Sequence, residues 1–349
     1  MSLGNRIIVT LTTLLVLAIA AALLVTIKVS QFMDTELLVA ENGIDFDVTA
    51  GSSFAAVSSQ MVASDLIDHD RWLRLYVRWH DLAGAIQAGE YLIESGATPR
   101  SLLEQFRTGA VQLHAFTIVE GWNHHEVLQA LHANDAVKAT MTDEDWPALL
   151  ESLGAAVMYP EGLFLPETYR FPRNTSDRAL LSQAYGLMQS VLSEEWTARS
   201  SDAPVISTYE ALILASIVEK ETARADERPK IAGVFSRRLA TRMRLQTDPT
   251  VIYGIGPAFD GNLTRKHLQT DTPYNTYTRH GLPPTPIAMP GRAAINAALN
   301  PDAGTELYFV ATGLGDGSHK FSTTKREHDA AVAEYLRRMR QRRRAGSNP

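Results

Sequence analysis

The pattern of apolar and polar positions changes several times along the chain, and each change predicts a different kind of element. The longest apolar run covers residues 7–27, which carry no charge and lie between Arg6 and Lys28. A helix of about 20 apolar residues is long enough to cross the ~30 Å hydrocarbon layer of a membrane. The run therefore predicts a transmembrane helix over 7–27, which would anchor the chain in the cytoplasmic membrane.

A cleaved signal peptide is the alternative interpretation of the same run. Its apolar core is usually ~7–15 residues long and ends at a small-x-small cleavage site. Here the alanines at 18 and 20–22 are followed by five more uncharged residues, 23–27, which favours an uncleaved anchor. A short segment, 1–6, in front of a single span is usually a cytoplasmic tail. Lys28 on the other side of the span weakens the excess of positive charge that normally marks the cytoplasmic side. We therefore expect a single-pass inner-membrane protein with residues 28–349 in the periplasm.

Shorter patterns behind a juxtamembrane segment, 28–43, predict a small α/β module over 44–110. Positions 46–48 alternate as a strand does, and 50–53 form a turn and a helix cap before apolar residues at helical spacing. Further helices are predicted around 72–80 and 99–106, with a strand ending near Tyr91. Residues 116–130 repeat the order of strand, glycine turn and capped helix.

The rest of the chain, 111–336, predicts a mixed α+β domain. Residues 140–197 are mostly helical in pattern, apart from a stretch with two prolines and aromatic residues at 159–169, which we expect to be an ordered loop. The end of the chain, 337–349, is rich in arginine. This tail is either a solvated helix end or a segment attracted to anionic lipid or wall polymer.

The most informative segment is a helix with no polar face. Ser207 with Glu210 three residues later is a capping-box pattern, which predicts that a helix begins here. Of residues 211–218 all but Ser216 are apolar, and a helix that is apolar on every side is buried. Such a helix would carry Glu219 from the interior to whatever opening lies at its end. Partial burial would raise the pKa of Glu219 above its ordinary ~4.3, so that it could donate a proton at neutral pH.

A second carboxylate, Glu221, lies two residues further on. On a helix of ~3.6 residues per turn it points about 200° away from Glu219, so the two cannot form a shared dyad. We expect one poised carboxylate and one solvated carboxylate. A purely structural interpretation of Glu219 stays open, in which it ends a buried helix and pairs with a nearby Arg or Lys.

Downstream, 243–254 predicts a short helix with Asp248 as N-cap, Pro249 in the first position and Gly254 beyond the end. Gln246 has no structural role in this interpretation and is a candidate for binding sugar hydroxyls. The following loop has five prolines between 273 and 290, which exclude a helix interior or a central strand. With Tyr274, Asn275 and Tyr277 it is a suitable wall for a sugar cleft, and a proline-rich ligand for another protein is the alternative.

Composition excludes several other functions. The chain has 33 basic and 39 acidic side chains and a net charge of −6, which argues against a nucleic-acid partner. It has no cysteine, so disulfides and thiolate metal sites are excluded. The adjacent pair His124-His125 lacks metal-site spacing, and Gly254 and Gly256 form only a lone GxG. We expect no metal and no cofactor.

Several motifs together resemble one known family over nearly the whole chain. They are LASIVEKET at 214–222, LQTDPTV at 245–251, YNTY at 274–277 and GLPP at 281–284. The segments EGW at 120–122, EGLFLPETY at 161–169, YFV at 308–310 and H-x-F at 319–321 fit it too. In this order they resemble the MltG (YceG-like) endolytic murein transglycosylases, in which the 44–110 part would be LysM-like.

The resemblance implies that Glu219 is the catalytic glutamate and that peptidoglycan glycan strands are the substrate. It implies cleavage of the β-1,4 bond between N-acetylmuramic acid and N-acetylglucosamine inside a strand, leaving a 1,6-anhydro end. Gln246, Asp248, Tyr274, Asn275 and Tyr277 would orient the sugar. Penicillin-binding peptidoglycan synthases are the implied partners. Because the sugar's own O6 is the nucleophile, one glutamate can protonate the leaving oxygen and then take the O6 proton.

Two alternatives remain at this stage. Hydrolysis of a glycoside usually takes two carboxylates and a water, and Glu219 with Asp248 could form such a pair. The chain could also be a non-catalytic anchor that only binds peptidoglycan.

Overall fold

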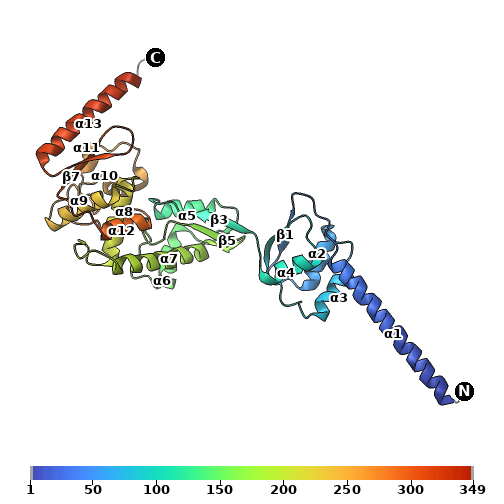
Figure 1. Cartoon of the computed structure of the whole chain (residues 1–349). Helices are drawn as coiled ribbons and strands as arrows, with labels where there is room; N and C mark the ends of the chain where they lie inside the picture. Colours follow the sequence, from blue (N-terminus) through green and yellow to red (C-terminus); the bar gives the residue numbers. More distant parts are fainter. Residues whose placement is uncertain (1–2, 347–349) are drawn as a thin grey trace. The chain divides into compact units, whose positions relative to one another are not determined.

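The computed structural model describes residues 3–346 and divides into two compact units. Unit 1 comprises the chain up to His114 together with Arg170–Asn174, and unit 2 comprises Ala115–Tyr169 and the chain from Thr175 onward. Both units mix helices with short strands (Figure 1), so the predicted α+β class is confirmed. The predicted tail residues 1–2 and 347–349 lie outside the described residues. Unit 1 holds α1 (Leu3–Met33), β1 (Ile44–Val48), α2 (Phe54–Ala63), α3 (Arg71–Trp79), β2 (Gly89–Ile93) and α4 (Pro99–Thr108).

Helix α1 has two parts with different surroundings. Its apolar side chains from Ile7 to Leu24 are mostly more than half exposed, whereas Val29 and Met33 are buried in the core of unit 1. Within the described residues α1 is the one helix long and apolar enough to cross a membrane. Residues 28–33, predicted as the start of a juxtamembrane segment, therefore continue the helix and join the fold of unit 1.

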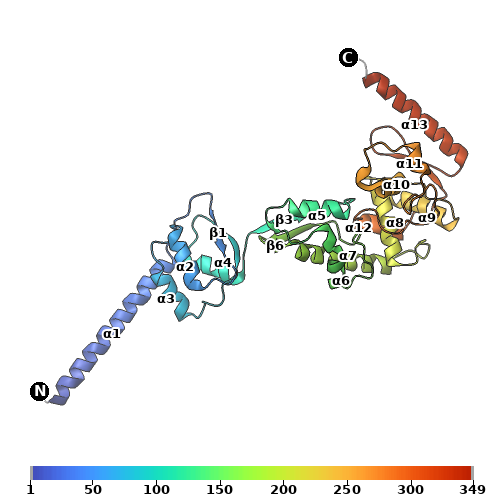
Figure 2. The same ribbon diagram turned by 180° about the vertical axis from the view of Figure 1, so that it is seen from behind.

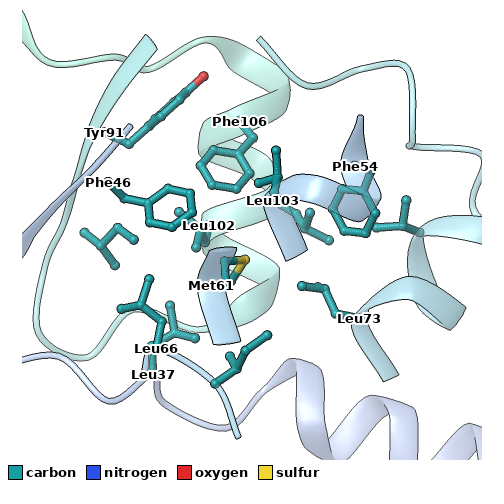
Figure 3. Packing of buried hydrophobic residues seen from close by; sticks show 14 of the residues in the cluster. Leu37, Phe46, Phe54, Met61, Leu66, Leu73, Tyr91, Leu102, Leu103 and Phe106 are labelled. Atoms are coloured by element: carbon teal, nitrogen blue, oxygen red, sulfur yellow. The ribbon is translucent and has the colours of Figure 1, made fainter. Parts of the chain in front are cut away.

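The core of unit 1 follows from the alternation in β1. Phe46 and Val48 point inward while Asp45 and Asp47 stay exposed, and β1 pairs antiparallel with β2 so that Phe46 lies opposite Tyr91. Phe106 of α4 packs against both rings, at centroid distances of 6.0 Å and 4.7 Å. Figure 3 shows this aromatic group surrounded by aliphatic side chains. Ser53 caps α2 and Pro99 occupies the first turn of α4, as predicted.

Unit 2 begins within β3 and is built mainly from helices. β3 pairs with β5, β4 with β6, and β7 with β8, each as a two-stranded sheet. The division between the units falls within β3 and β5. The elements are β3 (Leu113–Thr117), α5 (His124–His132), β4 (Val137–Lys138), η1 (Asp143–Asp145), α6 (Trp146–Ser152), β5 (Thr168–Pro172), β6 (Thr175–Ser176), α7 (Asp177–Thr197), α8 (Thr208–Glu221), α9 (Arg228–Ala240), α10 (Asp248–Ile255), η2 (Gly256–Ala258), α11 (Arg265–Gln269), α12 (Arg292–Leu299), β7 (Tyr308–Ala311), β8 (His319–Ser322) and α13 (Lys325–Gly346).

Helix α8 is the centre of unit 2. Residues 211–218 are all buried, and the helix packs against α7, α9, α10 and α12, which surround it in Figures 1 and 2. Ser207 is its N-cap, but the reciprocal half of the predicted capping box is wrong, because the Glu210 carboxylate accepts from the Ile206 N–H instead. The single polar residue of the run, Ser216, accepts a hydrogen bond from the Ile287 N–H at 3.0 Å. The helix is thereby fixed to the proline-rich loop.

The two loops predicted to be ordered lie against each other. Gly162 has a φ of +78°, and a Cβ added there would lie 2.6 Å from Pro286. Only glycine combines this backbone conformation with so close an approach. Nearby, the Trp122 carbonyl accepts from the Met289 N–H at 2.7 Å and the Met289 carbonyl accepts from the Gly121 N–H at 2.9 Å. These contacts bring residues 120–122 and 289–291 to the C-terminal end of α8.

Candidate active site

The last turn of α8 places consecutive side chains in different surroundings. Lys220 lines a cavity of about 940 Å³, and Glu221 lines a separate cavity of about 350 Å³. Glu219 is not among the lining residues of either cavity. The negative end of the helix dipole disfavours a carboxylate at this position. Both glutamates therefore lie where their neutral form is favoured.

Glu219 is held in a closed polar arrangement. Its side chain is 5% exposed, and Oε1 accepts from the Arg228 guanidinium at 3.1 Å. Oε2 accepts from the Gly291 N–H at 3.0 Å. Burial raises the pKa of Glu219, and the Glu120 carboxylate adds to this, while the bonds from Gly291 and Arg228 lower it. The pKa of Glu219 is raised on balance, as the sequence suggested. Its ion-pair partner is Arg228, which fits the structural interpretation of Glu219 as a helix-end residue paired with a nearby arginine.

Glu221 is only partly exposed, so the carboxylate expected from the sequence to be solvated is instead bonded to a protein group at the edge of a cavity. The Thr247 hydroxyl donates to its carboxylate, and burial raises the pKa of Glu221. The Asp248 charge raises this pKa further, whereas Thr247, His319 and Arg238 lower it. The helical spacing correctly placed the two glutamates on different sides of α8. The spacing could not reveal that Thr247 and its neighbours pack over the side of α8 that carries Glu221.

The small cavity, which we name the Glu221 cavity, collects three of the predicted sugar-binding residues. Gln246, Asp248 and Tyr277 line it together with Glu221. Asp248 is exposed, and its Oδ1 accepts from the Tyr277 hydroxyl at 2.5 Å. The remaining lining side chains come from α9, β7 and α13: Arg238, Tyr308, Phe309, Val310, Lys325 and His328.

The local prediction around Asp248 needs correction. Thr247, not Asp248, occupies the N-cap position of α10, and its hydroxyl bonds Glu221 instead of capping the helix. Asp248 is the first helical residue, so its carboxylate is left to face the Glu221 cavity. Gly254 lies inside α10, and Gly256, with a φ of +65°, ends it.

The other two predicted sugar-binding residues lie elsewhere. Tyr274 lines the larger cavity, and its hydroxyl bonds Thr285 at 2.9 Å. Asn275 is only 1% exposed, and its side-chain amide donates to the carbonyls of His267, Leu268 and Thr270. A side chain so enclosed holds the loop together and is not available to a sugar, so its predicted binding role is corrected to a structural one.

Sequence reasoning missed several residues of this site. Arg228 and Gly291 are 9 and 72 positions from Glu219, and Arg238 and His328 reach the Glu221 cavity from α9 and α13. Of these residues, only Arg228 could have been suspected from the sequence. It lies in the first turn of α9, where the positive end of the helix dipole disfavours a cation, so a nearby carboxylate partner was to be expected. Within 3–346 no group of acidic and histidine residues is arranged to hold a metal ion.

These observations define the protein as an α+β protein with two acidic side chains in the last turn of a buried helix. One of them, Glu221, borders a cavity that is also lined by an amide, a second carboxylate and tyrosines. A sequence profile of the YceG-like family matches residues 46–334. The chain therefore belongs to the YceG-like family.

Relatives with known names agree with this assignment. An endolytic murein transglycosylase of Bacillus subtilis (strain 168) is 30% identical over 84% of this chain and 85% of its own length. One from Streptococcus pneumoniae serotype 2 (strain D39) is 27% identical over 83% of this chain, which spans 58% of that longer protein. A crystal structure of a yceG-like protein from Listeria monocytogenes has a TM-score of 0.51 at 27% identity, covering 83% of this chain and 99% of that one.

Proposed function

We propose that this chain is an endolytic murein transglycosylase that cleaves peptidoglycan glycan strands, with Glu221 as its acid and base. The observation that carries the proposal is the position of Glu221 at the end of buried α8, with a raised pKa, in a cavity shared with Gln246, Asp248 and Tyr277. Family membership and the names of the relatives support the reaction class.

Of the two glutamates on α8, the contacts favour Glu221 over Glu219. Both oxygens of Glu219 already accept hydrogen bonds, from Arg228 and Gly291, and its side chain is enclosed. Glu221 accepts from Thr247 and borders a space that a ligand can enter. An acid must come within hydrogen-bond reach of the proton it transfers. The assignment of Glu219 from the sequence stays a prediction, and the two variants can be compared directly.

The proposed mechanism needs one carboxyl group. Protonated Glu221 donates its proton to the oxygen that bridges N-acetylmuramic acid C1 and N-acetylglucosamine, and this bond breaks. The O6 hydroxyl of the same muramic acid bonds to C1, and its proton returns to the Glu221 carboxylate. A 1,6-anhydro ring forms and no water is consumed. The exposed Gln246 and the Asp248–Tyr277 pair are positioned to bind hydroxyl or N-acetyl groups.

A specific observation supports a second candidate, a hydrolase of the same bond. Asp248 lines the same cavity as Glu221 and affects its pKa, so a water could be activated by one carboxylate while the other donates a proton. Mass spectrometry of the digestion products separates the two reactions. Products ending in 1,6-anhydro muramic acid support the transglycosylase, and reducing ends, which are heavier by one water, would establish the hydrolase instead.

The proposal extends to location and partners. The exposed apolar part of α1 supports a membrane anchor, with both units on the periplasmic side. In unit 1 the order β1-α2-α3-β2 with an antiparallel strand pair supports a LysM-like module that adds affinity for glycan. Penicillin-binding peptidoglycan synthases, as the family resemblance implies, would supply the new strands.

A further inference from the structure

The larger cavity of unit 2 has the composition of a ligand site that the proposed reaction does not use. We name it the Tyr253 cavity. Its volume of about 940 Å³ lies at the upper end of the range for small-molecule sites. It is lined by the first turn of α5, the 159–169 loop, α10 with η2, and the loop that carries Tyr274. All of these segments belong to unit 2.

The lining combines aromatic rings with polar groups of both charges. Tyr159, Tyr253, Tyr274 and Phe259 contribute rings, and the rings of Tyr253 and Tyr274 lie edge to face at 5.0 Å. Glu126, Asp143 and Lys220 are among the charged side chains. Mixed charges do not favour an anion or a cation. Aromatic rings beside hydrogen-bonding groups suit a ligand with apolar faces and polar edges, and a sugar ring has this form.

A hydrogen-bond network around the buried Glu161 holds the ring of Tyr253 in place. Glu161 is 0% exposed, and its Oε2 lies 2.7 Å from His124 Nδ1 and accepts from the Tyr253 hydroxyl at 2.9 Å. The Tyr159 hydroxyl lies 2.9 Å from that of Tyr253. A buried carboxylate is costly unless it is bonded in this way. The His124 ring is itself buried, so this bond fixes the wall of the cavity from behind.

The two cavities are built from the same elements. Helix α8 contributes Lys220 to the Tyr253 cavity and Glu221 to the Glu221 cavity, and α10 likewise lines both. The 272–277 loop contributes Tyr274 to one and Tyr277 to the other. A strand held in the Tyr253 cavity is therefore held by the elements that form the reaction site.

We propose that the Tyr253 cavity is a second carbohydrate subsite, which binds an N-acetylglucosamine–N-acetylmuramic acid segment of the strand away from the cleaved bond. This inference rests on the proposed function. Tyr159 is the most exposed of the four tyrosine and phenylalanine rings, at 38% exposed, and would stack on a sugar face, with neighbouring polar groups bonding its hydroxyls.

Hydrogen–deuterium exchange of the full-length chain in detergent tests this proposal, with Glu221→Gln in the background to prevent turnover. The probe is peptide-free glycan strands. We expect protection of segments 121–132 and 249–259, which line the Tyr253 cavity. Tyr159→Ala should raise the strand concentration for half-maximal protection of both segments about tenfold. Tyr159→Phe keeps the ring and should bind like the parent, which makes it the matched control.

The outcomes separate this inference from the proposed function. Protection at 244–248 and 308–310 without protection at 121–132 would overturn the subsite and leave the Glu221 site intact. Protection at 121–132 in the Glu221→Gln background, together with a wild-type chain that cleaves no strand, would refute the proposed function and keep the subsite. Protection seen only with strands that carry stem peptides, or an equal effect of Tyr159→Ala and Tyr159→Phe, would contradict the assignment to glycan.

Discussion

At the scale of the residue, two similar side chains on one helix end differ in what they can do. Glu219 and Glu221 both have raised pKa values because burial disfavours their charge. They differ in their partners: an arginine and a backbone N–H for Glu219, a threonine hydroxyl and an open cavity for Glu221. A perturbed pKa alone therefore does not identify the acid, and access to a ligand decides between them.

The raised pKa of Glu221 predicts a pH-dependent stability. The folded chain binds the proton more tightly than the unfolded chain, so this stabilisation is full below the ordinary value of 4.5 and is lost as pH rises through the folded-state pKa. Glu221→Gln cannot ionise. The melting temperature of wild type minus that of Glu221→Gln should fall as pH rises from about 4.5 to 8. The exposed Glu144→Gln is the control, and a difference that grows with pH would contradict the assignment.

At the scale of the element, the buried apolar run of α8 contains one polar side chain, Ser216. The Ser216 hydroxyl accepts from the Ile287 N–H, so the proline-rich loop is tied directly to the buried helix. Ser216→Ala would leave that N–H buried without its partner. We expect a loss of about 1–3 kcal/mol in the free energy of unfolding, measured by urea denaturation. The exposed Ser190→Ala on α7 should have little effect. Equal effects of the two substitutions would show that the contact is unimportant.

The helices and their approximate ends were predictable because they depend on local signals. Ser207, Ser53 and Pro99 marked helix starts, and the apolar run 211–218 marked burial. The environment of Glu221 was not predictable, because Thr247, His319 and Arg238 reach it from distant parts of the chain. Asn275 illustrates the same limit: a polar residue in an aromatic loop suggested sugar binding, whereas the fold closes three carbonyls around its amide.

At the scale of the whole molecule, α1 couples a membrane-length apolar segment to a folded unit. Val29 and Met33 belong both to α1 and to the core of unit 1, so the apolar helix continues directly into the folded unit. Leu37, just beyond the helix, joins the same core. An uncleaved anchor would keep unit 1 close to the membrane surface.

An uncleaved anchor predicts an intact N-terminus. Mass spectrometry of the protein purified from membranes should find the apolar residues 7–27 still attached, and alkaline carbonate should not extract it. Replacing Val16 by Arg would place a charge near the centre of the run, at a cost of about 2.5–3.5 kcal/mol for insertion, and should weaken retention. Val119→Arg in unit 2, also at an exposed position, is the control. A mature N-terminus between 18 and 28 would show that the run is a signal peptide.

The most direct test of the account compares Glu221→Gln with Glu219→Gln in the full-length chain, using peptide-free glycan strands and the mass of the products. Either change is nearly isosteric, so folding can be checked by circular dichroism. We predict that Glu221→Gln yields no 1,6-anhydro product. Glu219→Gln should retain measurable cleavage, because the Glu219 carboxylate bonds Arg228 and the Gly291 N–H and does not line the cavity that holds the strand. Cleavage that persists in Glu221→Gln and disappears in Glu219→Gln would contradict the account.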